Sequence, residues 1–199
     1  MARAKKGLQT RYSVAIVGDG ETERIYFDNV RDADRPDNLK IFPDAPKKIG
    51  TYRGVLTRAE QLKDDGYDKV YALIDMDKVI SDRQQAAYQT AKSAARAKGV
   101  IVLENNPCFE VWLLMLFRYT TKLFKDCDSV SAELKEHIPG YNKSEKFIVG
   151  AKLYEKFKDQ IIKQGIPNAK KLEANREMQD ELYPRAQAYE FFEWYFRRE

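Results

Sequence analysis

Residues 70–78 read VYALIDMDK, a short apolar run that ends in two acids. The first five residues are apolar without a helical gap, which is typical of a strand buried on both faces in a parallel sheet. Asp75 and Asp77 follow at the carboxyl end of this strand, and ligands of open α/β sheets bind at that edge. We therefore expect the fold to be organised around this strand, with its two acids at a binding site.

The spacing of the two acids indicates a metal ion. If the chain stays extended to Asp77, the side chains of Asp75 and Asp77 lie on one side of it and that of Met76 on the other. Two carboxylates held in this way repel each other unless a cation lies between them, and Mg²⁺ is the usual occupant because it prefers oxygen ligands. The alternative is a solvated loop after a strand, since short acidic pairs are common in loops.

The rest of the first 117 residues repeats the order of strand, then helix. Apolar, β-prone segments predict further strands at 13–17, 38–42 and 100–103. Helical spacing and strong helix formers predict helices at 21–30, 51–65, 82–98 and 108–117. This alternation implies a mostly parallel, doubly wound α/β sheet with right-handed crossovers.

The β pattern fades after residue 117. Helices are predicted at 129–137, 143–163, 168–182 and 184–198, separated by glycines and prolines. No linker or low-complexity tract isolates this half of the chain. We therefore expect a basic tail at 1–12, an α/β core at 13–117, and a helical region at 118–199 that packs on the same core.

The composition of the 199 residues is that of a folded protein, with 43% hydrophobic and 12% aromatic residues. There is no run of about 18 apolar residues, and the basic start has no apolar stretch after it, so we expect no membrane association and a cytoplasmic location. The net charge of +4 is compatible with a polyanionic partner, although most of the 33% charged residues balance one another. Cys108 and Cys127 form no CxxC and have no histidine nearby, which predicts neither a disulfide framework nor a zinc site.

Three further acids are candidates for the same site. Asp19 lies between two glycines at another strand end, although a plain turn in which Asp19 or Thr22 caps the next helix is the alternative. Glu23 follows one helical turn later, close enough to reach the same crevice. Glu110 begins a largely apolar helix beyond a third strand end, where it either faces the crevice or is simply favoured by the helix dipole.

Three motifs in this order resemble the RloB family, whose core resembles the Toprim domain. They are VGDGETERIYF at 17–27, IDMD at 74–77 and NNPCFEVWLL at 105–114. The resemblance extends to Gly140, Tyr141 and Lys143 and, weakly, to the C-terminal helices, so it covers nearly the whole chain. It implies a Toprim-like, mostly parallel sheet flanked by helices, and a role in defence against phage and at restriction loci.

The same resemblance implies Mg²⁺-dependent endonuclease chemistry on DNA or RNA, with Mn²⁺ as a substitute. Carried over by position, the metal ligands are Asp19, Asp75 and Asp77, with Asp19 also as general acid or base. Glu23 and Glu110 complete the expected catalytic set, and Glu23, like Asp19, would add a metal contact or move a proton. Two departures bear on activity: Asp19 stands where the family favours Glu, and residues 115–117 read MLF where relatives often carry His-Phe.

Basic residues near the mouth of the crevice are expected to hold the nucleic acid by charge, with an affinity that falls as salt rises. They are Lys47, Lys48, Lys78 and Lys143. One alternative is a non-catalytic defence partner that binds nucleic acid or a sensor ATPase. Another is a haloacid-dehalogenase-like phosphatase with Asp75 as nucleophile, but in that class the Asp-x-Asp motif ends the first strand, whereas two strand candidates precede it here.

Overall fold

A five-stranded sheet forms the centre of the computed structural model, which describes residues 11–46, 50–175 and 181–198. The strands are β1 (Tyr12–Val17), β2 (Leu39–Asp44), β3 (Lys69–Asp75), β4 (Val100–Asn106) and β5 (Arg185–Ala186). Their order across the sheet is β2-β1-β3-β4-β5, and the first four run parallel. The predicted mostly parallel α/β class is confirmed.

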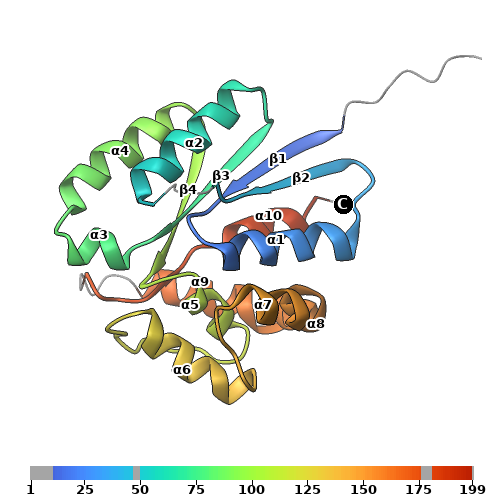
Figure 1. The fold of residues 1–199 in the computed structure, drawn as a ribbon, viewed down its shortest axis with the longest axis vertical. Coiled ribbons are helices and arrows are strands. Elements are labelled where there is room, and N and C mark those ends of the chain that lie inside the picture. Colours follow the sequence, from blue (N-terminus) through green and yellow to red (C-terminus); the bar gives the residue numbers. More distant parts are fainter. Residues whose placement is uncertain (1–10, 47–49, 176–180, 199) are drawn as a thin grey trace, which may run out of the picture.

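Helices cover both faces of the sheet, which explains the continuous apolar runs of β1, β3 and β4. On one face lie α2 (Tyr52–Asp64) and α4 (Gln85–Ala97), and on the other lie α1 (Glu21–Asp34) and α10 (Tyr189–Phe196) (Figure 1). Alternate residues of β3 enter the two cores: Val70 packs with the α2 side and Tyr71 with the α10 side. Each side chain of the strand is therefore used for packing until the chain reaches Asp75.

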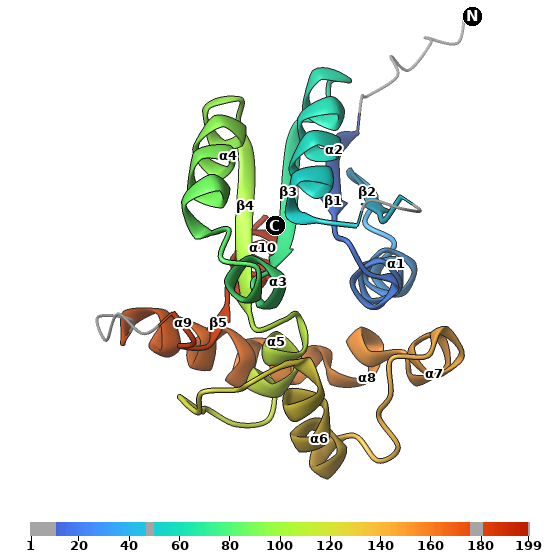
Figure 2. The same cartoon turned by 60° about the vertical axis from the view of Figure 1, so that its left-hand side comes forward.

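A second group of helices lies beyond the carboxyl ends of the strands, as Figures 1 and 2 both show. It comprises α5 (Glu110–Met115), α6 (Cys127–His137), α7 (Glu145–Ala151), α8 (Leu153–Gln160), the π-helical η1 (Ile161–Gly165) and α9 (Ile166–Ala174). Trp112 of α5 stacks on Phe192 of α10 at a centroid distance of 5.2 Å. Apolar side chains of this second group of helices belong to the same hydrophobic core as α1 and α10.

Several predicted boundaries were wrong. The expected helix at 82–98 is α4 alone, preceded by a separate short helix α3 (Asp77–Ser81). The expected helix at 143–163 is broken at Lys152, whose φ of 43° is incompatible with a continuous α-helix. The predicted 168–182 helix ends at Ala174, and residues 176–180 lie outside the described ranges. The strand predicted at 13–17 begins one residue earlier, because β1 starts at Tyr12.

The fifth strand was missed because its residues carry no β signal. Within the stretch predicted as helix 184–198, Arg185 and Ala186 pair antiparallel with the end of β4. Arg185 also places its guanidinium 2.7 Å from the fully buried carboxylate of Glu104, which Lys92 contacts from α4. A buried carboxylate such as that of Glu104 requires charged partners, and here they come from two other elements, α4 and β5.

The expectation that the cysteines would not pair is also wrong. Cys108 and Cys127 form a disulfide, with their Cα atoms 5.8 Å apart. The first follows β4 and the second begins α6, and the packing of α6 on α5 brings them together. In the described ranges, no helix has both the length and the apolar character needed to cross a membrane.

Candidate metal centre

Three carboxylates meet at the carboxyl edge of the sheet. A ligand oxygen of each of Asp19, Glu23 and Asp75 lies within 4.8 Å of the others. Asp75 ends β3, Asp19 lies in the turn after β1, and Glu23 lies in the first turn of α1. Because β1 and β3 are parallel neighbours, their carboxyl ends lie side by side and bring these acids to one place.

The two glycines around Asp19 make room for Glu23. A Cβ on Gly18 would lie 3.2 Å from the Cβ of Glu23, and one on Gly20 would lie 2.5 Å from its Oε2. A larger residue at either glycine position would therefore compete with the Glu23 side chain for space. The Gly-Asp-Gly sequence lets a buried glutamate, 4% exposed, fold back against the strand ends.

The turn after β4 holds Asp75 in place. The backbone N–H of Phe109 donates to Oδ1 of Asp75 at 2.9 Å. The carbonyl oxygen of Pro107 accepts from the N–H groups of Met76 and Asp77 at 3.0 and 3.1 Å. The Asn-Pro-Cys-Phe segment thus fixes both the orientation of the Asp75 carboxylate and the path of the chain that follows it.

Burial and mutual repulsion raise the pKa values of the cluster. Desolvation, reinforced by Asp19 and Glu110, raises the pKa of Glu23 to about 8. Desolvation and the charge of Glu23 raise the pKa of Asp75 well above its usual range, and desolvation also raises that of Asp19. Because these pKa values are raised, protons compete with a divalent cation for the three carboxylates.

Glu110 lines the pocket and is paired with a lysine. It is 1% exposed, and Nζ of Lys143 lies 2.9 Å from its Oε1, to which Tyr141 OH donates at 3.1 Å. Its second oxygen, Oε2, has no hydrogen-bond partner among the described residues. Tyr141 was not among the expected site residues, although it lies in the 140–143 motif quoted for the resemblance.

The five expected acids line one pocket of about 400 Å³. Its lining is Asp19, Gly20, Glu21, Thr22, Glu23, Asp75, Asp77, Lys78, Glu110, Cys127 and Lys143. Two of the four expected lysines, Lys78 and Lys143, are thus at the pocket, whereas Lys47 and Lys48 lie outside the described residues. Cys127 had no signal in the sequence that placed it here.

The expectation of an extended Asp75–Asp77 pair is wrong. The strand ends at Asp75, Met76 has helical angles (φ −89°, ψ −11°), and Asp77 begins α3. Asp77 accepts a hydrogen bond from the N–H of Lys78 at 2.6 Å and lines the pocket outside the three-acid group. Glu23, for which we expected either a metal contact or a proton transfer, takes the third position beside Asp19 and Asp75.

The donor set suits a hard cation, because all three clustered groups are carboxylates and Mg²⁺ and Mn²⁺ prefer oxygen ligands. Fold and site together define an α/β protein with an acidic pocket at the carboxyl edge of a parallel sheet. The model that defines the RloB-like protein family matches residues 14–193, and the chain belongs to this family, as the motifs predict. No curated protein and no solved structure matches the chain.

Proposed function

We propose that this protein is a Mg²⁺-dependent endonuclease of Toprim type that hydrolyses phosphodiester bonds of DNA or RNA in defence against phage. The observation that carries the proposal is the meeting of Asp19, Glu23 and Asp75 within 4.8 Å at the sheet edge. Phosphodiester hydrolysis needs charge neutralisation at a phosphate more than it needs a covalent nucleophile. A carboxylate cluster that holds a divalent cation answers that need.

Asp19, Glu23 and Asp75 would hold Mg²⁺ or Mn²⁺. The bound ion would supply a Lewis acid that neutralises a phosphate oxygen and orients a water. Around it, Lys143 and Lys78 attract the phosphate backbone into the pocket. Asp19, which is partly exposed where Glu23 is buried, is the acid best placed to exchange a proton with solvent.

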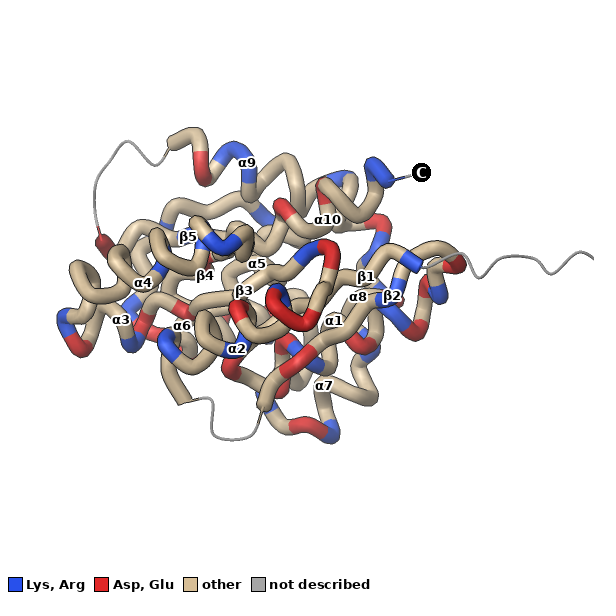
Figure 3. Tube along the Cα trace, turned by 90° about the horizontal axis from the view of Figure 1, so that it is seen from above, with Lys and Arg blue, Asp and Glu red and all other residues tan. Residues whose placement is uncertain are grey.

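Charge elsewhere on the molecule is mixed. Figure 3 shows Lys and Arg positions interspersed with Asp and Glu positions along the described part of the trace. Among the described residues, the lysines that line the pocket, Lys78 and Lys143, are therefore the ones we expect to attract the substrate.

The test is a cleavage assay on DNA and structured RNA in Mg²⁺ or Mn²⁺. We expect cleavage by the natural protein and its loss in Asp75→Asn, which keeps the shape of the side chain and removes its charge. The matched control is Asp159→Asn, an aspartate on α8 whose side chain is 82% exposed. Undiminished cleavage by Asp75→Asn would exclude this pocket as the active site.

A second candidate is a non-catalytic defence partner that binds nucleic acid or a sensor ATPase through the same fold. One observation favours it: Asp19 is a methylene shorter than the glutamate typical of the family, and a displacement of about 1 Å can cost a hundredfold in rate. Binding of nucleic acid without cleavage in either metal would support it. The phosphatase alternative is weaker, since β3 is the third strand along the chain.

A further inference from the structure

The disulfide lies in the wall of the acidic pocket. Cys127 lines the pocket, whereas Cys108 is fully buried behind it. Both sulfur atoms and a carboxylate oxygen of Asp75 lie within 4.8 Å of one another. Sγ of Cys127 is also 3.7 Å from Oδ2 of Asp77. Asp75, Asp77 and Cys127 line the pocket, and the buried sulfur of Cys108 lies directly behind them.

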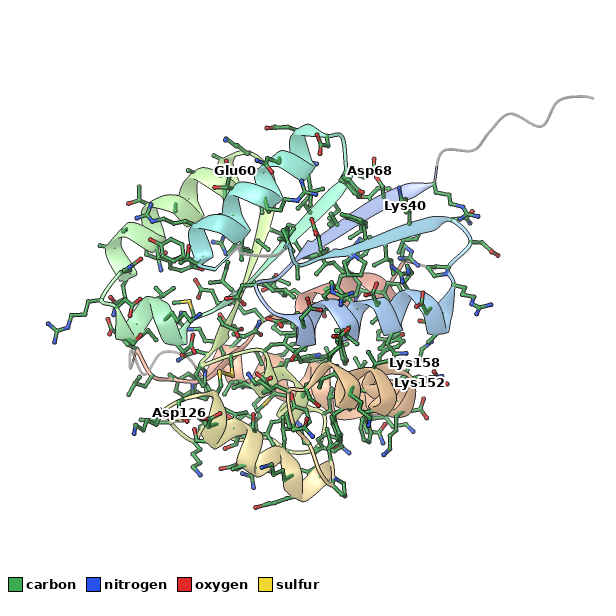
Figure 4. All side chains as sticks on the ribbon, viewed as in Figure 1. Lys40, Glu60, Asp68, Asp126, Lys152 and Lys158 are labelled. Carbon is green, nitrogen blue, oxygen red and sulfur yellow. A yellow bond between two sulfur atoms is a disulfide. The ribbon has the colours of Figure 1, made fainter. Side chains whose placement is uncertain are left out.

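Both cysteines are positioned by contacts that do not depend on the disulfide. Asp126, labelled in Figure 4, caps α6 by accepting from Ser129 N–H at 2.9 Å, which fixes the helix start at Cys127. Cys108 lies between Pro107 and Phe109, both hydrogen-bonded to the end of β3. Reduction of the bond would thus leave the two sulfurs close together.

We propose that the reduced chain binds a thiophilic divalent cation such as Zn²⁺ through Cys108, Cys127 and Asp75, with Asp77 as the fourth ligand. Two thiolates with carboxylate oxygens form a donor set that Zn²⁺ accepts and Mg²⁺ does not favour. This site is distinct in chemistry from the cluster of Asp19, Glu23 and Asp75, although Asp75 belongs to both.

The chemistry balances with a thiol reductant. The reductant supplies two electrons and two protons, the S–S bond breaks to give two thiols, and two reductant thiols join as a disulfide. Binding of Zn²⁺ displaces both thiol protons and leaves two thiolate ligands. Oxidation by a small disulfide removes two electrons, restores the Cys108–Cys127 bond and releases the ion.

The shared ligand has a consequence that rests on the proposed function. An ion held by the sulfurs engages Asp75, which is then lost to the three-acid cluster, so Zn²⁺ is expected to inhibit the reduced protein and spare the oxidised one. The redox state of one cysteine pair would thereby select the class of cation that Asp75 serves.

The experiment uses Co²⁺ as a spectroscopic substitute for Zn²⁺ on the full chain. We expect the reduced, reductant-free protein to show a thiolate-to-Co²⁺ charge-transfer band that saturates at one equivalent and disappears on addition of Zn²⁺. The oxidised protein should show no such band. Absence of the band in the reduced natural protein would overturn the proposal without the use of any variant.

Variants assign the ligands. We expect Cys127→Ser and Asp75→Asn to weaken Co²⁺ binding by the reduced protein more than about tenfold, since even outer partners of a metal ligand are worth that much. Glu23→Gln, which alters only the oxygen cluster, should keep the band. Thermal unfolding checks that each variant is folded. Equal Co²⁺ affinity in Cys127→Ser would contradict the assignment, and neither result depends on nuclease activity.

Discussion

Gly20 leaves free the space that the Glu23 carboxylate occupies: a Cβ at position 20 would lie 2.5 Å from Oε2 of Glu23. The atom that must move is the end of a flexible side chain, and Gly20 has an extended φ of −120° that any residue can adopt. A methyl group at this position is therefore expected to displace the Glu23 carboxylate and leave the fold intact.

The first prediction follows from this relationship. Gly20→Ala should lower Mn²⁺ affinity more than about tenfold, because the displaced carboxylate of Glu23 no longer reaches the ion. The free energy of unfolding should change by less than about 1 kcal/mol, because substitutions that create no buried strain have small effects on stability. Calorimetric titration with Mn²⁺ and thermal unfolding measure the two quantities. The control is Gly150→Ala, since a Cβ at Gly150 would meet no described atom within 4 Å apart from its chain neighbours and its own helix backbone. Unchanged Mn²⁺ affinity in Gly20→Ala would remove Glu23 from the ligand set.

The second prediction concerns pH in the absence of metal. The folded pKa of Glu23 is about 8 against 4.5 in a model peptide, so between these values the folded state binds more protons than the unfolded state. The stability contributed by protonated Glu23 is complete below about pH 4.5 and is lost as pH rises through about 8. Unfolding in urea across this range should show stability falling with pH, and Glu23→Gln should flatten the fall.

A matched variant tests whether the effect is specific to the cluster. Glu155→Gln changes an exposed glutamate on α8 that pairs with Lys152. It should leave the pH dependence as in the natural protein. If Glu23→Gln and Glu155→Gln behave alike, the raised pKa of Glu23 is not the cause of the fall.

The third prediction concerns metal addition. An ion that binds the folded state alone stabilises it by about 2.7 kcal/mol at one hundred times its Kd. Mn²⁺ should therefore raise the melting temperature at pH 8, where the cation competes with fewer protons. Asp75→Asn should abolish the shift, whereas Asp159→Asn should retain it. A shift of equal size in both variants would place the binding ion elsewhere.

The fourth prediction concerns the lysine that lies beside the acids. Lys143, paired with Glu110 at 2.9 Å, is expected to contact a nucleic-acid phosphate. Lys143→Met should weaken binding and reduce the slope of log affinity against log salt by about 0.9, the loss of one phosphate contact. Fluorescence anisotropy at several salt concentrations measures this slope. The control is Lys163→Met on η1, where the lysine side chain is 70% exposed, and it should leave the slope unchanged.

The local sequence was sufficient for the parallel strands and for the gathering of the acids. An apolar run such as 70–74 is stable in a strand that is buried on both faces, which is typical of a parallel sheet. The carboxyl ends of parallel strands then lie at the same edge of the sheet. The positions of Asp19, Asp75 and Glu110 after three such strands follow from that rule. The family motifs lie at the same three strand ends and agree with the match over residues 14–193.

Only the tertiary structure decided which side chains touch. The pairing of β5 depends on Glu104 and Arg185, which are far apart in sequence, and the Cys108–Cys127 bond depends on how α6 packs on α5. The exchange of Asp77 for Glu23 in the three-acid group depends on where β3 stops and α3 starts. A pattern of periodicity fixes which face of an element is buried, whereas contacts between elements depend on loop paths and packing that no local pattern encodes.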